Sequence, residues 1–208
     1  MPKIRLSLCI FLAVSAFLAS GPLSFQNRDK TDQPEKVMDV LGVRPGMVIG
    51  EVGAGYGYFT FKLARRVGES GKVYANDISE SALSALRTSK EQQDLTNLEI
   101  IRGEVEDPLL PIGALDMVFM VNVFHDLEKP IALLDNLLRS LKQGGLVVII
   151  EQDPEKHSNA SGHFYQREEV LRLIRQSKFE LDRIETFLTY QNIFVLRPKN
   201  GKSETISR

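Results

Sequence analysis

The chain has 208 residues, enough for one ordinary domain, and 43% of them are hydrophobic and 25% charged. That composition is typical of globular proteins and excludes a disordered or fibrous chain. Its 26 basic side chains nearly balance 27 acidic ones, so no overall positive charge is available to attract nucleic acid. One cysteine excludes a disulfide framework and a cysteine-based zinc cluster, and three histidines leave little for a histidine-rich metal site.

Residues 1–23 differ in character from the rest of the chain. Lys3 and Arg5 precede an uncharged apolar run from Leu6 to Leu18, and small residues follow at positions 19–21. This order is typical of a secretory signal peptide, although an uncleaved, tilted membrane anchor or a mis-assigned start also fits. We therefore expect an exported (periplasmic) or membrane-anchored protein, and a cytoplasmic one if the start is mis-assigned. A polar linker over 24–33, a folded domain over 34–198 and a flexible tail over 199–208 are expected to follow.

Short apolar runs alternate with helical stretches through the folded domain. Asp32 is expected to cap a first helix that begins at Pro34 and ends at Gly42. The expected strands are 47–52, 73–76, 98–101, 115–121 and 146–150, and the expected helices between them are 58–67, 79–91 and 130–141. Strands that are apolar on both faces and separated by helices indicate a parallel sheet.

The end of the chain shows a different pattern. A helix is expected over 166–177, and two apolar segments, 181–188 and 193–196, follow it with a short turn between them. Such a pair predicts an antiparallel hairpin added to the parallel strands. The whole is thus an α/β domain with a mostly parallel sheet of seven strands, the last of them antiparallel.

A glycine-rich segment, Glu51–Gly57 (Glu-Val-Gly-Ala-Gly-Tyr-Gly), lies where the first strand passes into a helix. Such a turn lets the backbone approach a ligand closely, and the helix start offers free N–H groups. In a dinucleotide-binding loop the third glycine would fall at position 58, which is Tyr58. Glu51 would repel a pyrophosphate but suit an ammonium group. The segment favours an amino-acid ligand over a dinucleotide, and a plain strand-to-helix turn is the alternative.

The same segment resembles motif I of the class I S-adenosylmethionine-dependent methyltransferases, and the likeness extends over most of 28–198. Asp77, which ends the second strand, matches the family's acidic residue for the ribose hydroxyls, and a carboxylate can accept from both. Residues 102–107 resemble the loop beside the adenine, with Glu104 where the family usually has Asp. Residues 115–122 match motif IV, and 141–145 resemble the turn into the fifth strand, with Gln143 where proline is usual.

The likeness is greatest to small bacterial methyltransferase-domain proteins, some of which begin with an apolar leader. It implies a three-layer, Rossmann-like fold, S-adenosyl-L-methionine as cofactor, and methyl transfer to a small-molecule acceptor. It also implies a set of cofactor-binding residues: Glu51, Gly53, Ala54, Gly55, Gly57, Asp77, Ile78, Glu104, Val105 and Asn122.

The acceptor side offers fewer candidates. Methyl transfer by in-line displacement needs alignment and exclusion of water, and it needs a general base only when the acceptor arrives protonated. His125, just past the fourth strand, is the candidate base, and a histidine bonded to the backbone is the alternative. Tyr56, Glu151 and His163 are candidates for contacts with the acceptor.

Several other functions are excluded or left open. No metal is expected, because Asn122 and Glu151-Gln152 stand where the metal-assisted catechol enzymes of the family have Asp and Asp-Asn. The motifs of the DNA-methylating enzymes are missing and no basic patch is present, so a nucleic-acid substrate is not expected. A protein that binds the cofactor without turnover and an NAD(P)-dependent oxidoreductase stay open as alternatives.

Overall fold

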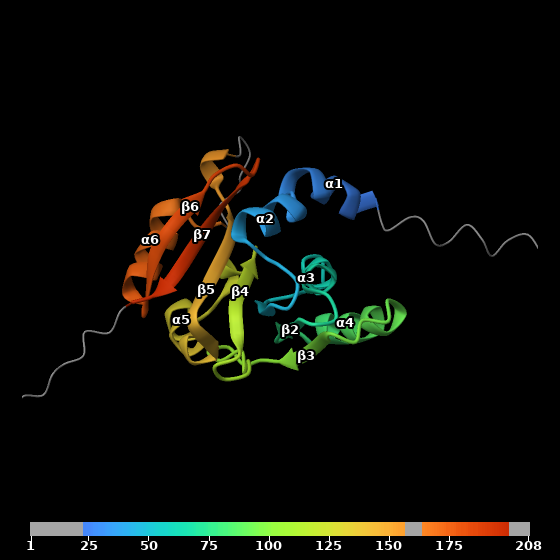
Figure 1. Cartoon of the computed structure of the whole chain (residues 1–208). Helices are drawn as coiled ribbons and strands as arrows, with labels where there is room; N and C mark the ends of the chain where they lie inside the picture. The colour runs from blue at the N-terminus through green and yellow to red at the C-terminus, as the bar shows by residue number, and fades with distance from the viewer. Residues whose placement is uncertain (1–22, 157–163, 200–208) are drawn as a thin grey trace, which may run out of the picture.

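A computed structural model describes residues 23–156 and 164–199, and a seven-stranded sheet forms its centre (Figure 1). The strands are β1 (Val48–Val52), β2 (Lys72–Asp77), β3 (Leu98–Arg102), β4 (Leu115–Val121), β5 (Leu141–Gln152), β6 (Phe179–Glu185) and β7 (Gln191–Pro198). They lie in the order β3-β2-β1-β4-β5-β7-β6. The first five pair in parallel, whereas β7 runs antiparallel to both β5 and β6. The expected α/β fold with an antiparallel last strand is confirmed.

Helices cover both faces of the sheet and complete three layers (Figure 1). α2 (Pro34–Leu41), α3 (Thr60–Val67) and α4 (Glu80–Gln92) pack on one face, and α5 (Pro130–Leu137) and α6 (Arg167–Gln176) pack on the other. Side chains of β5 alternate between the two cores: Val148 and Ile150 join the first, and Val147 and Ile149 the second. Because both faces are buried, the central strands are almost continuously apolar, which is the pattern that indicated a parallel sheet.

Local signals explain where the helices begin and end. The hydroxyl of Ser79 caps α4 by accepting a hydrogen bond from the backbone N–H of Ala82 (3.5 Å). Pro130 stands in the first turn of α5, where its missing N–H leaves no bond unmade. The predicted helix over 130–141 is shorter than expected, because a 3₁₀ turn, η2 (Leu138–Ser140), follows α5 and β5 already begins at Leu141. Two further 3₁₀ turns are η1 (Phe124–Asp126) and η3 (Pro154–Lys156).

All but the last residue of the segment expected to be a polar linker, 24–33, instead belong to helix α1 (Leu23–Asp32). Arg28 and Asp32 lie one helical turn apart and form an ion pair with an N–O distance of 3.0 Å, which stabilises the helix. Asp32 therefore pairs within α1 and does not cap α2; Gln33, in the left-handed conformation (φ 41), separates the two helices. The linker prediction was wrong because a polar segment can form a helix when its side chains find partners, here within α1 and on the folded domain.

The structure describes the residue after the C-terminal end of the predicted domain but not most of the predicted leader. Lys199, expected to open the tail, is fixed to the domain: its Nζ donates to the carbonyl oxygens of Arg175 (2.9 Å) and Ser177 (2.6 Å). Residues 1–22 of the leader predicted over 1–23, and residues 200–208 of the predicted tail, lie outside the described residues. The signal peptide or anchor therefore stays a prediction. Of the helices that the structure describes, none is long and apolar enough to cross a bilayer.

Candidate cofactor site

A cavity of about 620 Å³ lies at the carboxyl ends of β1 and β4. These strands are neighbours in the sheet, and the helices that follow them, α3 and α5, cover opposite faces. Such a switch point leaves a crevice at the edge of an α/β sheet, where ligands bind. The residues that line the cavity are Arg28, Thr31, Asp32, Glu51, Gly53, Ala54, Gly55, Tyr56, Tyr58, Phe59, Val121, Asn122, Gln152 and Tyr190.

The glycine-rich loop needs glycine for two physical reasons. Gly53 (φ 69) and Gly57 (φ 86) have left-handed backbones that other residues rarely adopt. There is also no room for a side chain at either position. A Cβ at Gly53 would lie 2.3 Å from Cγ2 of Val123, and a Cβ at Gly57 would lie 2.3 Å from Cε2 of Phe61. The loop therefore packs tightly on the fold while its outer side faces the cavity.

Glu51 is a buried carboxyl at the end of β1, and it lines the cavity. It is 2% exposed, and its Oε2 accepts a hydrogen bond of 2.5 Å from the hydroxyl of Thr60. Burial raises the pKa of Glu51 to about 7, because the charged form loses its hydration. Thr60 and the nearby Arg28 favour the charged form and oppose that rise. A cationic ligand group in the cavity would add a direct charged partner to the hydrogen bond from Thr60 and would favour the ionised carboxylate further.

Asp77 holds the glycine-rich loop to the end of β2. Its Oδ2 accepts a hydrogen bond from the backbone N–H of Gly55 and its Oδ1 one from the backbone N–H of Ser79, both at 2.8 Å. An ionised carboxylate has about four acceptor sites, so these two bonds leave capacity for ligand hydroxyls. The structure thus shows a role in shaping the loop, and the predicted contact with a ribose stays a prediction.

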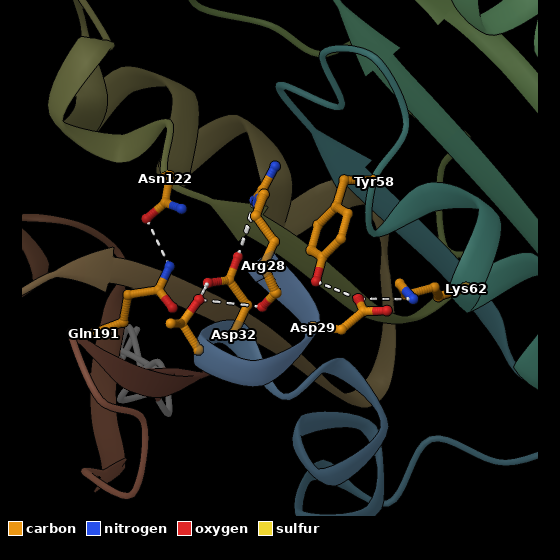
Figure 2. Close-up of polar contacts among 8 residues, drawn as sticks. Arg28, Asp29, Asp32, Tyr58, Lys62, Asn122 and Gln191 are labelled. Atoms are coloured by element: carbon orange, nitrogen blue, oxygen red, sulfur yellow. Dashed lines mark hydrogen bonds and ion pairs between the residues drawn. The ribbon is translucent and has the colours of Figure 1, made fainter. Parts of the chain in front are cut away.

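Asn122 closes the cavity at the end of β4. It has an unusual left-handed backbone (φ 52), and its Oδ1 accepts a hydrogen bond of 2.9 Å from Nε2 of Gln191 at the start of β7 (Figure 2). The bond joins residues that are 69 positions apart in the chain. The cavity wall is therefore braced by the antiparallel end of the sheet as well as by its parallel part.

His125, the candidate base, lies in η1 next to the end of β5. Its side chain is 5% exposed, and its Nδ1 is 2.7 Å from Oε1 of Glu151, which is 1% exposed. Hydrogen bonding to Glu151 raises the pKa of His125. Neither residue is among the described residues that line the cavity. The geometry supports a role for this pair in positioning the loop after β4, and proton transfer by His125 stays a prediction.

The comparisons with known proteins agree with this geometry. A family model described as "Methyltransferase domain" matches residues 44–194 of the chain. The chain belongs to the methyltransferase-domain family. The likeness to class I S-adenosylmethionine-dependent methyltransferases that the motifs indicated is thereby confirmed, together with the Rossmann-like architecture.

Individual relatives of the chain differ in the share of their own length that the match covers. A crystal structure of a SAM-dependent methyltransferase from Aquifex aeolicus matches 85% of this chain and 98% of its own, with 27% identity and a TM-score of 0.75. A ubiquinone/menaquinone biosynthesis C-methyltransferase of Shewanella sp. (strain ANA-3) is 28% identical over 58% of this chain and 48% of its own length. A demethylmenaquinone methyltransferase of Lactococcus lactis is 31% identical over 56% of this chain and 46% of its own length. The chain spans about half the length of these two curated relatives.

The structure brings some of the predicted site residues together in the cavity wall and leaves others outside it. The cavity wall contains Glu51, Gly53, Ala54, Gly55, Tyr56 and Asn122. Three others, Ile78, Glu104 and Val105, are exposed beyond the ends of β2 and β3 and are not among the described lining residues. Their contact with an adenine stays a prediction. His163 lies outside the described residues. Within 23–156 and 164–199, no three His, Cys, Asp or Glu side chains gather as a metal site would require.

Sequence reasoning missed the part of the cavity that α1 and the start of β7 supply. Arg28, Thr31 and Asp32 come from α1. Gln152 ends β5, and Tyr190 directly precedes β7, the antiparallel neighbour of β5. The spacing of Arg28 and Asp32 was a local signal for a helix. Nothing in the sequence near either residue indicated that this helix would lie against the cavity.

Proposed function

We propose that the chain is an S-adenosylmethionine-dependent methyltransferase that acts on a small-molecule acceptor. The observation that carries the proposal is the buried carboxyl of Glu51, with its raised pKa, in the wall of a cavity formed by a glycine-rich loop. A carboxylate that is poorly solvated gains most from a cationic partner, and the ammonium group of an amino acid is such a partner. The donor set therefore fits the amino-acid end of this cofactor.

The chain's own residues would bind, orient and shield the reactants. S-adenosylmethionine supplies a methyl group that is activated by a positively charged sulfur. Glu51 and the glycine-rich loop would hold the amino-acid end, and Asp77 would accept from the ribose hydroxyls while it keeps the loop in place. Phe59 and Val121 give the cavity apolar walls that exclude water. Transfer then depends on the alignment of an acceptor atom with the methyl group, which is the effect of holding both in one cavity.

Only the names of the curated relatives suggest which class of small molecule accepts the methyl group. The two curated relatives are named for ubiquinone and menaquinone biosynthesis and for demethylmenaquinone, and the chain matches about half of each. An aromatic ring of the quinone type, methylated on carbon, is therefore the first acceptor to test, ahead of a wider set of metabolites.

The proposal is tested in two steps with the full-length chain. Thermal unfolding is first followed with added S-adenosylhomocysteine, the product of transfer, and separately with NAD. We expect S-adenosylhomocysteine to raise the melting temperature and NAD to leave it unchanged. A shift with NAD alone would favour the oxidoreductase alternative, and no shift with either would overturn the proposal.

The second step measures transfer itself. The chain is incubated with methyl-labelled S-adenosylmethionine and a reduced demethylnaphthoquinone, and in parallel with a metabolite extract. Label in an extracted organic product is expected, and Glu51→Gln should lower its yield because the amino-acid end is held less tightly. Binding of S-adenosylhomocysteine without any label transfer would favour the alternative of a non-catalytic binding protein.

A further inference from the structure

Helix α1 forms one wall of the cavity, although it precedes the segment 44–194 that the family model matches. Its second half contacts the start of α3 and the residue Tyr58 just before that helix. Asp29 accepts a hydrogen bond of 2.7 Å from the hydroxyl of Tyr58 and forms an ion pair of 3.0 Å with Lys62 (Figure 2). These contacts fix α1 at the cavity mouth, so its side chains belong to the site.

Arg28 is the cationic side chain that α1 contributes to the cavity wall. Its guanidinium carbon lies 3.9 Å from the centroid of the Tyr58 ring, which is a cation–π contact. Its Nε and Nη2 lie 3.1 and 3.0 Å from Oδ2 of Asp32. A planar group held on two sides in this way loses little further freedom when it meets a ligand.

The cavity wall holds a carboxyl group, that of Glu51, and a guanidinium group, that of Arg28. Glu51 stands at the end of β1 and Arg28 on α1, and the positive charge of Arg28 is close enough to favour the charged form of Glu51. Asp32, 7% exposed, balances part of the charge on Arg28. A ligand that carries one ammonium and one carboxylate group can satisfy both a buried carboxylate and a guanidinium in the same cavity.

We propose that Arg28 binds the carboxylate of the amino-acid end of the cofactor, while Glu51 receives its ammonium group. The inference rests on the proposed function and adds α1 to the cofactor site. A guanidinium has five N–H donors, so Arg28 can keep its bond to Asp32 while a second edge meets the ligand. Asp32 and Tyr58 are then positioning residues for Arg28. The alternative holder of the carboxylate is the backbone of the glycine-rich loop and the start of α3.

The test compares two ligands that differ in the amino-acid end. S-adenosylhomocysteine carries both the ammonium and the carboxylate, whereas 5′-methylthioadenosine carries neither. Dissociation constants are measured by calorimetry on the full-length chain, for the wild type, Arg28→Ala, Arg28→Lys and Lys30→Ala. Lys30 is an exposed cation on the same helix and serves as the matched control.

We expect Arg28→Ala to weaken S-adenosylhomocysteine binding about 10- to 100-fold, the usual effect of losing a hydrogen bond to a charged group. Binding of 5′-methylthioadenosine should change less than about twofold, a small free-energy difference. Arg28→Lys keeps the charge and should recover part of the loss, and Lys30→Ala should match the wild type for both ligands.

The outcomes separate the inference from the proposal on which it rests. Unchanged S-adenosylhomocysteine binding by Arg28→Ala, with binding by the wild type intact, overturns the role of Arg28 and leaves the proposed function standing. An equal loss for both ligands overturns it too, because α1 would then act by shape and not by charge. A wild-type chain that binds neither ligand overturns the proposed function itself.

Discussion

Nδ1 of His125 lies 2.7 Å from Oε1 of Glu151, and the backbone N–H of His125 donates to Oε2 of the same carboxylate at 3.1 Å. Both side chains are almost fully buried. The two bonds join the turn that follows β4 to the end of β5. Phe164 packs edge-on against the imidazole, with 4.8 Å between ring centroids, and covers the pair from the segment before α6. Glu151 therefore fixes the turn that begins just after Asn122 in the cavity wall.

This pair predicts a pH dependence of stability above neutral pH. Hydrogen bonding to Glu151 raises the pKa of His125 above its ordinary 6.5, and Asp126, 3.5 Å from Nε2, acts in the same direction. The folded chain thus holds the proton more tightly than the unfolded chain. The resulting stabilisation is complete below about pH 6.5 and is lost as the pH rises through the folded-state pKa.

We expect the free energy of unfolding to fall as the pH rises above 6.5, and His125→Asn to reduce that fall. Urea unfolding at several pH values measures both slopes. Glu51, with a pKa of about 7, is present in both chains, so its own titration cancels from the comparison. Equal slopes for the wild type and His125→Asn would show that the pair does not titrate as described.

Gly53→Ala and Gly55→Ala are expected to differ, although both glycines have a positive φ (69 and 55). A Cβ at Gly53 would meet Cγ2 of Val123 at 2.3 Å, whereas a Cβ at Gly55 has no described atom within 4 Å. Gly55→Ala should therefore cost only backbone strain, about 1–2 kcal/mol. Gly53→Ala must also displace Val123, so its urea midpoint should be clearly lower. Equal midpoints would mean that Val123 moves freely.

The elements that the sequence predicted well are those with a local cause. Neighbouring residues in the sequence are enough to predict the apolar runs of β1 and β4 and the turn with glycines at 53, 55 and 57. The bonds that complete the cavity have no such local signal. Gln191 reaches Asn122 across 69 positions, and Tyr58 reaches Asp29 across 29. A polar stretch such as 24–33 looks like a linker until the fold supplies its partners, which is why α1 was missed.

Glu51→Gln is expected to stabilise the ligand-free chain at pH 8. Because the folded-state pKa of Glu51, about 7, is above the ordinary 4.5, the favourable contribution of its protonated form is lost as the pH rises toward and through 7. At pH 8 the folded chain must bury a charge, whereas glutamine is neutral and can still accept from Thr60. The gain should be on the order of 3 kcal/mol at most, and small at pH 5.

Urea unfolding of the wild type and Glu51→Gln at pH 5 and pH 8 measures this difference. The matched comparison is Thr60→Val, which removes the hydroxyl that donates to Glu51 and should destabilise the chain more at pH 8 than at pH 5. A Glu51→Gln chain that is less stable than the wild type at pH 8 would contradict the prediction. A carboxylate retained at a cost in stability is typical of a binding site.

The affinity for S-adenosylhomocysteine should rise with pH up to about 7 in the wild type and stay flat in Glu51→Gln. An ammonium group binds the charged form of Glu51, so below its pKa of about 7 the carboxyl must first lose a proton. Each pH unit below that value then weakens binding by up to about tenfold. Calorimetry between pH 5.5 and 7.5 gives the two curves, and 5′-methylthioadenosine, which lacks the ammonium group, should show no such slope with either chain. Parallel curves for the wild type and Glu51→Gln would place the ammonium group away from Glu51, and the buried carboxyl would then need another explanation.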